Sequence, residues 1–372
     1  YEGLGVEVIL GHARLVDPWT VAIRRRDGNE QRLTGRAIVH ATGAAPVIPD
    51  LPGLEAVPVL TSETVWRYLR ECPDEPPRLL VLGGGPIGCE LAQALARLGV
   101  PVTQVQRSDR LLRREDAEAA ELVRRALEAD GVRLLTGARV LRFEAAEVAE
   151  AGGGPCHALV QTVEGEERIP FDAVLCAVGR RARLEGYGLE ELGIPCDRTI
   201  TTDDTLRTLF PNIYAAGDAA GPYQFTHTAA HQAWYAAVNG LFGDLRRFRV
   251  DNRVIPRTTF TDPEVATVGI TETEAAERGI PVEVTRFPLA ELDRAIVDEA
   301  TDGFVKVLTP PGSDRILGVT IVGGHAGELL AEFVLAMKWN LPLSRILGTI
   351  HAYPTLSEAS KYVAGAWKKA HA

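Results

Sequence analysis

Three glycines, at residues 83, 85 and 88, form a GxGxxG pattern that could hold the phosphates of a dinucleotide. The pattern follows the apolar run LLVL and precedes a stretch rich in Ala and Leu, so it should connect a buried strand to a helix. In that setting Gly83 permits a tight turn, Gly85 lets a pyrophosphate approach the backbone, and Gly88 lets the helix pack closely on the strand. The unpaired N–H groups at the helix start would then face the phosphates.

The end of the following strand decides which dinucleotide is preferred. An acid there bonds the ribose 2′-hydroxyl of NAD, whereas arginines hold the 2′-phosphate of NADP. The sequence VTQVQRSDRLLRRED has Gln106 where the acid is expected, Arg107 next to it and Arg113 six residues further on. Two guanidinium groups can clamp a phosphate through paired hydrogen bonds, so NADP is favoured and NAD stays possible. The alternative is that these arginines only form a solvated basic turn.

Cysteines are the other residues with redox chemistry. Five are present, and none has CxxC spacing or a pattern with histidine that would predict a metal site. Their odd number is typical of reduced thiols in a cytoplasmic protein. Cys89 and Cys176 lie in apolar segments, where we expect buried and unreactive thiols.

Strands and helices alternate around the glycine pattern in an order that predicts a parallel sheet. From Arg78 the sequence reads as strand, glycine loop, helix and strand, and it continues through a helix at 116–130 and the strand VRLLTGARV. That order is typical of a βαβ unit. The unit is interrupted near GGGP at 152–155 and resumes in a strand pair that closes with FDAVLCAVGRR.

The flanking regions have a different character. Residues 1–50 alternate apolar and polar positions between DP and DGN turn signals, which predicts a β-meander ending in a buried strand. The Pro-rich break PDEPP at 73–77 indicates a domain boundary, and strands followed by helices after Asp251 indicate an α+β domain. The predicted fold is α/β, with three-layer Rossmann-like domains and a C-terminal α+β domain. The predicted divisions are 1–75, 76–182, 183–250 and 251–372.

Composition excludes several classes of protein. Apolar residues make up 46% of the sequence and charged residues 24%, which is ordinary for a soluble globular protein. A formal charge of −10 opposes binding to nucleic acid or to an anionic membrane. Because no apolar run is long enough to cross a bilayer, we expect a soluble, cytoplasmic chain without a membrane segment.

Four motifs make the sequence similar to one known family, the pyridine nucleotide-disulfide oxidoreductases. They are ATGAAP at 41–46, LGGGPIGCELA at 82–92, TLFPNIYAAGD at 208–218 and HAYPTLSEA at 351–359. They occur in the family's order over essentially the whole chain. The resemblance implies FAD and a nicotinamide nucleotide as cofactors, a C-terminal dimerisation domain, and a homodimer that passes electrons to a small-molecule acceptor.

The resemblance also implies roles for residues that would contact the flavin. Thr42 and Gly43 should lie near the adenosine and pyrophosphate of FAD, and Asp218, after Gly217, should hold the ribityl hydroxyls. A helix N-cap is the alternative role for Asp218. The segment beside the flavin ring would be Phe225, Thr226 and His227, although His227 is equally expected as a satisfied, partly buried side chain.

Two further roles follow from the same resemblance. Gly179 in AVGRR should face the nicotinamide nucleotide. Glu90 fits the carboxylate that pairs with a lysine beside the flavin, and that lysine would precede residue 1.

The C-terminal motif departs from the family in one position. A catalytic histidine usually precedes the proline, with a glutamate that orients it five residues later. This sequence has Tyr353 and Glu358 at those positions, and His351 lies two residues upstream. A phenol with an ordinary pKa of about 10 is a poor base, which puts ordinary disulfide reduction in doubt. A plain packing aromatic is the alternative for Tyr353.

Tyrosine at this place makes the chain resemble the mercuric reductases of the family. RSDRLLRRED and PRTTFTDPEVATVG are similar to their sequences as well, whereas the metal-delivering cysteine pair of their C-terminus has no counterpart in WKKAHA.

The family also implies an upstream strand, a further GxGxxG loop and a CxxxxC disulfide, so the chain is expected to be N-terminally truncated. The alternatives are a flavin reductase or oxidase without a dithiol, and a non-catalytic NADP-binding scaffold.

Overall fold

The computed structural model describes residues 1–72, 75–145 and 155–372. The predicted breaks at 73–77 and 152–155 lie partly outside these described residues. The chain forms two compact units. One comprises Tyr1–Ala45 and Arg180–Asn252, and the other comprises Pro46–Gly179 and Arg253–Ala372. We refer to them as the first and the second unit; the finer division into four domains stays a prediction.

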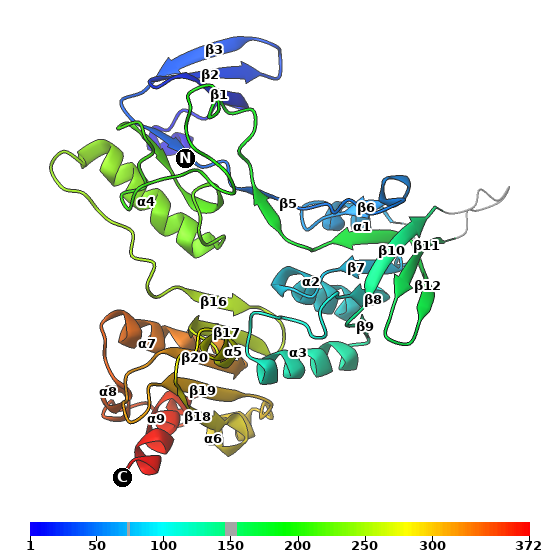
Figure 1. Cartoon of the computed structure of the whole chain (residues 1–372), viewed down its shortest axis with the longest axis vertical. Helices are drawn as coiled ribbons and strands as arrows, with labels where there is room; N and C mark the ends of the chain where they lie inside the picture. The colour runs from blue at the N-terminus through cyan, green and yellow to red at the C-terminus, as the bar shows by residue number, and fades with distance from the viewer. Residues whose placement is uncertain (73–74, 146–154) are drawn as a thin grey trace. The chain divides into compact units, whose positions relative to one another are not determined.

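The first unit begins with the predicted β-meander. Strands β1 (Gly11–Asp17), β2 (Thr20–Arg25) and β3 (Glu30–Thr34) form an antiparallel sheet in that order (Figure 1). Polar side chains close its turns, since the Asp17 carboxylate accepts from the Trp19 N–H at 2.8 Å and the Asp27 carboxylate accepts from the Asn29 N–H at 3.0 Å. The meander is confirmed, but the strand predicted to end it as a buried strand is only partly buried, since Val39 is 39% exposed.

The rest of the first unit contains a parallel strand pair and a long helix. Strand β4 (Ile38–His40) pairs in parallel with β15 (Ile213–Ala215), which leads through the short helix η3 (Gly217–Ala219) towards α4 (Thr226–Phe242). The carboxyl ends of β4 and β15 therefore lie at one edge. The unit's remaining elements are η1 (Glu2–Leu4) and the two-stranded sheet of β5 (Ala44–Pro46) and β14 (Arg180–Ala182).

The second unit contains the predicted parallel sheet. Its strand order is β6-β13-β7-β8-β9, and each of these neighbouring pairs is parallel. The strands are β6 (Val59–Leu60), β7 (Leu79–Leu82), β8 (Val102–Val105), β9 (Arg133–Leu135) and β13 (Ala173–Cys176). Leu79 and Val81 face one apolar cluster while Leu80 and Leu82 face another, which explains why all four residues of β7 are buried.

Short elements cover or extend this sheet. The helices are α1 (Val65–Glu71), α2 (Pro86–Arg97) and α3 (Ala117–Ala129), with η2 (Leu54–Ala56) before them. A second, antiparallel sheet consists of β10 (Arg139–Glu144), β11 (Cys156–Gln161) and β12 (Glu166–Phe171).

The C-terminal part of the second unit is an antiparallel sheet packed with helices. Its strand order is β16-β17-β20-β19-β18, with α7 packed on β17 and β20 and α9 packed on β18 and β19. The strands are β16 (Pro256–Thr259), β17 (Glu264–Gly269), β18 (Glu283–Pro288), β19 (Phe304–Thr309) and β20 (Gly318–Gly323). The helices are α5 (Glu272–Glu277), η4 (Leu289–Glu291), α6 (Asp293–Val297), α7 (Ala326–Lys338), α8 (Leu343–Leu347) and α9 (Glu358–Ala370). The predicted α/β fold with an α+β C-terminal part is confirmed.

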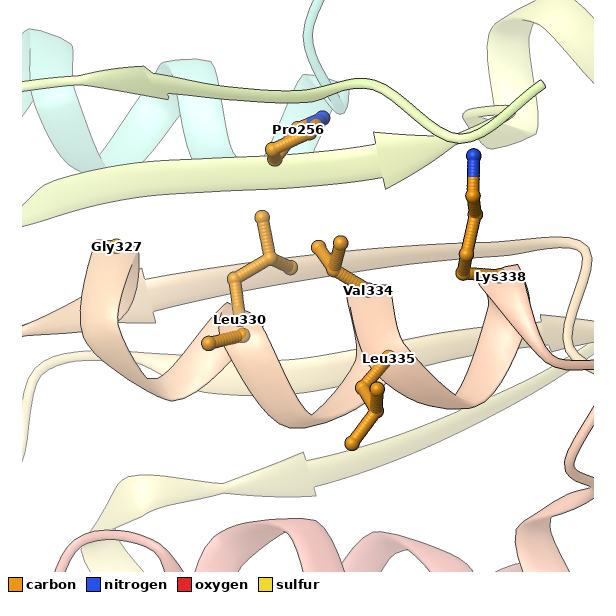
Figure 2. A pocket seen from close by; sticks show the side chains of 7 residues that line it. Pro256, Gly327, Leu330, Val334, Leu335 and Lys338 are labelled. Atoms are coloured by element: carbon orange, nitrogen blue, oxygen red, sulfur yellow. The ribbon is translucent and has the colours of Figure 1, made fainter. Parts of the chain in front are cut away.

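Helix α7 borders an apolar groove of about 320 Å³ together with β16. Figure 2 shows Leu330 and Val334 pointing from α7 towards Pro256, with Lys338 near one end of the groove. Leu330 and Phe333 are both buried in the C-terminal core, and Val334 packs against it. The apolar pattern of this helix therefore serves both the core and a surface groove.

None of the helices in the described part of the chain has the length and apolar character that crossing a bilayer requires.

Candidate functional site

The glycine loop connects β7 to α2, so the predicted strand, loop and helix are confirmed. Gly83 has φ +105°, and a Cβ there would lie 2.5 Å from the carbonyl oxygen of Ala177. A Cβ on Gly88 would lie 2.2 Å from the carbonyl oxygen of Gly83. At Gly85 a Cβ would meet no protein atom within 4 Å. Packing therefore requires glycine at 83 and 88, whereas Gly85 borders open space where a ligand could approach the backbone.

The start of α2 offers its amides to that space. Gly85 is the N-cap residue and has no side chain to cap the helix, and Pro86 follows it. Because proline lacks an N–H, the first amide donors of the helix come from residues 87 and 88. These donors and the positive end of the helix dipole form an environment suited to an anion.

The arginines of the basic loop after β8 differ in whether the side chain bonds to the loop backbone or is exposed. Arg110 donates to the backbone carbonyls of Glu115 at 3.1 Å and Arg113 at 2.9 Å, so its guanidinium group shapes the loop itself. The side chains of Arg107 and Arg113 are exposed. Gln106, at the position where an acid would mark NAD, accepts instead from the Gly84 N–H at 2.9 Å. The phosphate-binding role of Arg107 and Arg113 stays a prediction.

Gly179 lies at the same sheet edge as the glycine loop. It follows β13, which pairs with β7, and a Cβ on Gly83 would be 3.4 Å from the Val178 Cα. Gly179 has φ +142°, and a Cβ on it would meet no atom within 4 Å. Its carbonyl accepts from the Val47 N–H at 2.9 Å. The structure thus brings Gly179 to the loop, and its contact with nicotinamide stays a prediction.

Glu90 lies on α2 and bonds to the C-terminal part of the same unit. Its carboxylate accepts from the Phe260 N–H at 2.8 Å, and burial raises the pKa of this carboxyl group. The bond ties α2 to the segment after β16. Its predicted pairing with a lysine stays a prediction.

The five cysteines are all free thiols. Cys89 and Cys176 are buried, and burial raises their pKa values to about 12 and about 11. The predicted burial of both thiols is confirmed, and such raised pKa values favour the protonated thiol near neutral pH. The described residues contain no cluster of three or more histidine, cysteine or acidic side chains placed to hold a metal ion.

In the first unit, Gly217 and Asp218 follow the end of β15. Gly217 has φ +71°, and its N–H donates to the Gln232 side chain at 2.8 Å. The other end of that carboxamide donates to the Gly221 carbonyl at 2.9 Å, so Gln232 fixes the turn from α4. The Asp218 carboxylate is 3.8 Å from the guanidinium of Arg180. Asp218 lies inside η3 and caps no helix, so the N-cap alternative is wrong.

Thr42 and Gly43 follow the end of the neighbouring strand β4. The Thr42 hydroxyl donates to the Arg183 carbonyl at 2.8 Å and lies 3.2 Å from Nδ1 of His40. Gly43 has φ +67°, which favours glycine. Because β4 and β15 are parallel neighbours, this pair reaches the same edge as Asp218.

Phe225, Thr226 and His227 form the start of α4. No side chain caps this helix, and Thr226 and His227 are exposed. The rings of Phe225 and His227 stack with their centroids 5.2 Å apart. The surface position of His227 contradicts the alternative of a partly buried side chain.

The C-terminal motif forms a different kind of site. The hydroxyl of Tyr353 donates to the Asp293 carboxylate at 2.9 Å, and this bond to a charged group raises the pKa of the Tyr353 phenol. Nε2 of His351 lies 3.0 Å from the Glu332 carboxylate. Glu358 is 3% exposed at the start of α9, and its carboxylate accepts a long hydrogen bond of 3.4 Å from the Thr355 N–H. The two acids that bond to Tyr353 and His351 were not predicted from the sequence.

Two models of one protein family match the chain. The pyridine nucleotide-disulphide oxidoreductase model matches residues 2–233, and the dimerisation-domain model of the same family matches residues 255–364.

Curated relatives agree with these matches. A mercuric reductase of Staphylococcus aureus is 33% identical over 98% of this chain and 64% of its own length. A dihydrolipoyl dehydrogenase of Thermus scotoductus is 36% identical over 99% of this chain and 77% of its own length. The chain thus spans about two thirds to three quarters of the length of these relatives.

Solved structures resemble the fold over nearly the whole chain. The HOCl-induced flavoprotein disulfide reductase RclA of Escherichia coli gives a TM-score of 0.83 at 28% identity, covering 96% of this chain and 79% of that one. LpdA of Mycobacterium tuberculosis gives a TM-score of 0.82 at 29% identity, covering 98% and 78%.

Proposed function

Since the chain belongs to the pyridine nucleotide-disulphide oxidoreductase family, we propose that the whole protein is a FAD-dependent oxidoreductase. It takes hydride from NADPH and passes electrons to a disulfide or a metal ion. The observation that carries the proposal is the glycine loop, with open space at Gly85 beside an uncapped helix start.

The residues of the first unit fit a flavin nucleotide. Asp218 would hold the ribityl hydroxyls, Thr42 and Gly43 the adenosine and pyrophosphate, and the uncapped start of α4 would offer its amides beside the ring. FAD supplies the two-electron chemistry when bound. The chain's own groups bind and orient the reactants, since strand ends of a parallel sheet are where such ligands bind.

In the second unit, the glycine loop would bind the pyrophosphate of NADPH and Gly179 would border its nicotinamide end. Arg107 and Arg113 would hold the 2′-phosphate because they are exposed arginines of the loop. Arg110 is committed to the loop backbone.

Tyr353 would hold its proton at the acceptor site. Its bond to Asp293 favours the protonated phenol and uses its one O–H donor, so Tyr353 would not act as a base. Glu358 would keep the segment in place from its buried position. This favours an acceptor that needs no base beside it, such as a metal ion.

The protein would work as a homodimer. The dimerisation-domain match at residues 255–364 supports this, and apolar side chains are exposed in the same region. Leu335 is 57% exposed, Trp339 70% and Ile350 96%. Apolar surface of this kind is typical of an interaction site.

Spectroscopy of the purified whole protein tests the activity. We expect the absorbance of bound flavin and its bleaching when NADPH is added without oxygen. Flavin-loaded protein that NADPH fails to bleach would contradict the proposed reaction.

Nucleotide titration tests the preference for NADPH. We expect Arg107→Ala to weaken the binding of NADPH about 10-fold or more and to change the binding of NADH much less. The reason is that a charge-assisted hydrogen bond to a phosphate contributes roughly 1.5–3 kcal/mol. Arg125→Ala, which removes an exposed arginine that pairs with Glu121 on α3, is the matched control. Equal losses for NADPH and NADH in Arg107→Ala would refute the phosphate clamp.

A further inference from the structure

Two glutamines, Gln104 in β8 and Gln106 just after it, bond to one peptide unit of the glycine loop. Nε2 of Gln104 donates to the Gly83 carbonyl at 2.9 Å, and Oε1 of Gln106 accepts from the Gly84 N–H at 2.9 Å. That carbonyl and that N–H belong to the same peptide bond. Residues two apart on a strand share a face, which is how both side chains reach the loop.

The peptide unit between Gly83 and Gly84 needs such support. Glycine on both sides allows the peptide to rotate with little steric resistance, so the backbone alone does not choose one orientation. The neighbouring groups are also bonded, since the Gly83 N–H donates to the Val105 carbonyl at 2.9 Å and the Gly84 carbonyl accepts from the Leu112 N–H at 2.7 Å. With the two glutamines added, all four backbone polar groups of Gly83 and Gly84 have partners.

Gln104 is an unusual residue for its place in the core. It is fully buried, at 0% exposure, and its Oε1 has no hydrogen-bond partner among the described residues. An unpaired buried oxygen costs about 1–3 kcal/mol. An apolar side chain of similar size would avoid that cost but would leave the Gly83 carbonyl without this donor, so the two effects on stability oppose each other. What the carboxamide adds is its donor, which bonds to the Gly83 carbonyl at 2.9 Å and lies 3.9 Å from the Cys89 sulfur.

The side chain of Gln106, after the end of β8, is also bonded to the loop. Its carboxamide oxygen is taken by Gly84, and its nitrogen lies 3.5 Å from the Arg110 carbonyl. The side chain is therefore directed towards the loop and does not extend from it as a free donor. A ribose hydroxyl would have to compete with Gly84 for the oxygen of Gln106.

We propose that Gln104 and Gln106 are positioning residues that hold the Gly83–Gly84 peptide in one orientation and so preorganise the loop for a dinucleotide pyrophosphate. This inference rests on the proposed nucleotide role of the loop. Preorganisation strengthens binding because the ordering of the loop is completed before the ligand arrives. The hydrogen bonds from the Leu112 N–H and the two glutamine side chains together hold the Gly83–Gly84 backbone in place.

Equilibrium binding to the flavin-loaded protein tests the proposal without turnover. Gln104→Met and Gln106→Met are each titrated with NADP⁺ and NAD⁺ by calorimetry, and thermal unfolding is recorded. We expect each single variant to weaken the binding of NADP⁺ and of NAD⁺ by a similar factor of about 5 to 10. The loss of affinity in the double variant should be smaller than the product of the two single losses. Gln104→Met should unfold close to the parent's temperature, because removal of the unpaired oxygen offsets loss of the bond to Gly83. Gln161→Met, at an exposed glutamine of β11, is the control.

Hydrogen exchange at the Gly84 amide reads the peptide directly, with no nucleotide present. Exchange should become faster in both Met variants and should stay slow in Gln106→Glu, which keeps an acceptor for this N–H. Unchanged affinity in Gln104→Met, or losses that multiply in the double variant, would overturn the proposal. If the parent protein binds neither nucleotide, the proposed function is refuted. The positioning role of the glutamines is still tested in that case, because unchanged exchange of the Gly84 amide in the Met variants would overturn it.

Discussion

The dinucleotide loop and the C-terminal segment at residues 348–358 achieve their geometry in opposite ways. In the loop, backbone groups are bonded to residues of the next strand and turn, and a Cβ on Gly83 or Gly88 would lie within 2.5 Å of a carbonyl oxygen. In the C-terminal segment, Tyr353 and His351 are bonded through side chains to acids 60 and 19 residues away. The loop requires glycine at 83 and 88 and is held by the strand beside it, whereas the segment is held by side chains of separate helices.

Exposure adds to this difference. Leu111 and Leu112, which pack beside the loop, are 1% and 2% exposed, whereas Tyr353 is 69% exposed. Substitutions in the loop must therefore displace packed atoms. Substitutions in the segment mostly remove hydrogen bonds near water, which contribute less.

The largest expected effect separates two glycines of the loop. Gly88→Ala should lower the free energy of unfolding by about 3 kcal/mol and abolish NADP⁺ binding, because its Cβ would lie 2.2 Å from the Gly83 carbonyl oxygen. Gly85→Ala should keep the parent's melting temperature, since nothing lies within 4 Å of its Cβ, and should weaken NADP⁺ about 10-fold or more. Thermal unfolding and calorimetric titration measure both.

The two variants serve as controls for each other. If Gly85→Ala melted as early as Gly88→Ala, the open side of the loop would be needed for folding. If instead it bound NADP⁺ as the parent does, the pyrophosphate would not approach at Gly85.

The same contrast explains what the sequence could predict. The GxGxxG pattern between an apolar strand and a helix specifies a backbone path, so Gly83, Gly85 and Gly88 were placed correctly. The apolar surroundings of Cys89 and Cys176 predicted their burial for the same reason. Periodicity and turn chemistry act over a few residues, and these features are local.

Hydrogen bonds between side chains far apart in the sequence could not be predicted from such local patterns. Nothing near Tyr353 in the sequence indicates Asp293, and nothing near His351 indicates Glu332, because packing of separate helices brings each pair together. Gln104 did leave a signal, since a glutamine in an apolar strand is out of pattern. The pattern alone could not identify Gly83 as its acceptor.

A middle-sized effect is expected from the His351 contact. Glu332→Ala should lower the free energy of unfolding by about 1–2 kcal/mol, because the His351 side chain is buried and would lose its partner at 3.0 Å. Thermal unfolding measures the loss, and amide exchange at residues 349–352 should become faster. Glu328→Ala, at an exposed position of the same helix, should change little. Equal melting of the two variants would show that the contact does not hold the segment.

The smallest effect concerns Tyr353 and is read by titration. Asp293→Asn removes the charge and leaves only a weaker, neutral acceptor for the hydrogen bond. The amide therefore raises the phenol pKa less than the carboxylate does, so the pKa should fall towards 10.0. A raised folded-state pKa means that the bond's contribution to stability is present below about pH 10 and is lost as the pH rises through the folded pKa. Tyrosinate absorbance, with Tyr353→Phe subtracted, measures the shift, and Asp298→Asn on the same stretch is the control because it pairs with Arg294. An unchanged titration in Asp293→Asn would mean that the chemistry of the segment is set within residues 348–358, and the dependence of this segment on side chains of separate helices would be refuted.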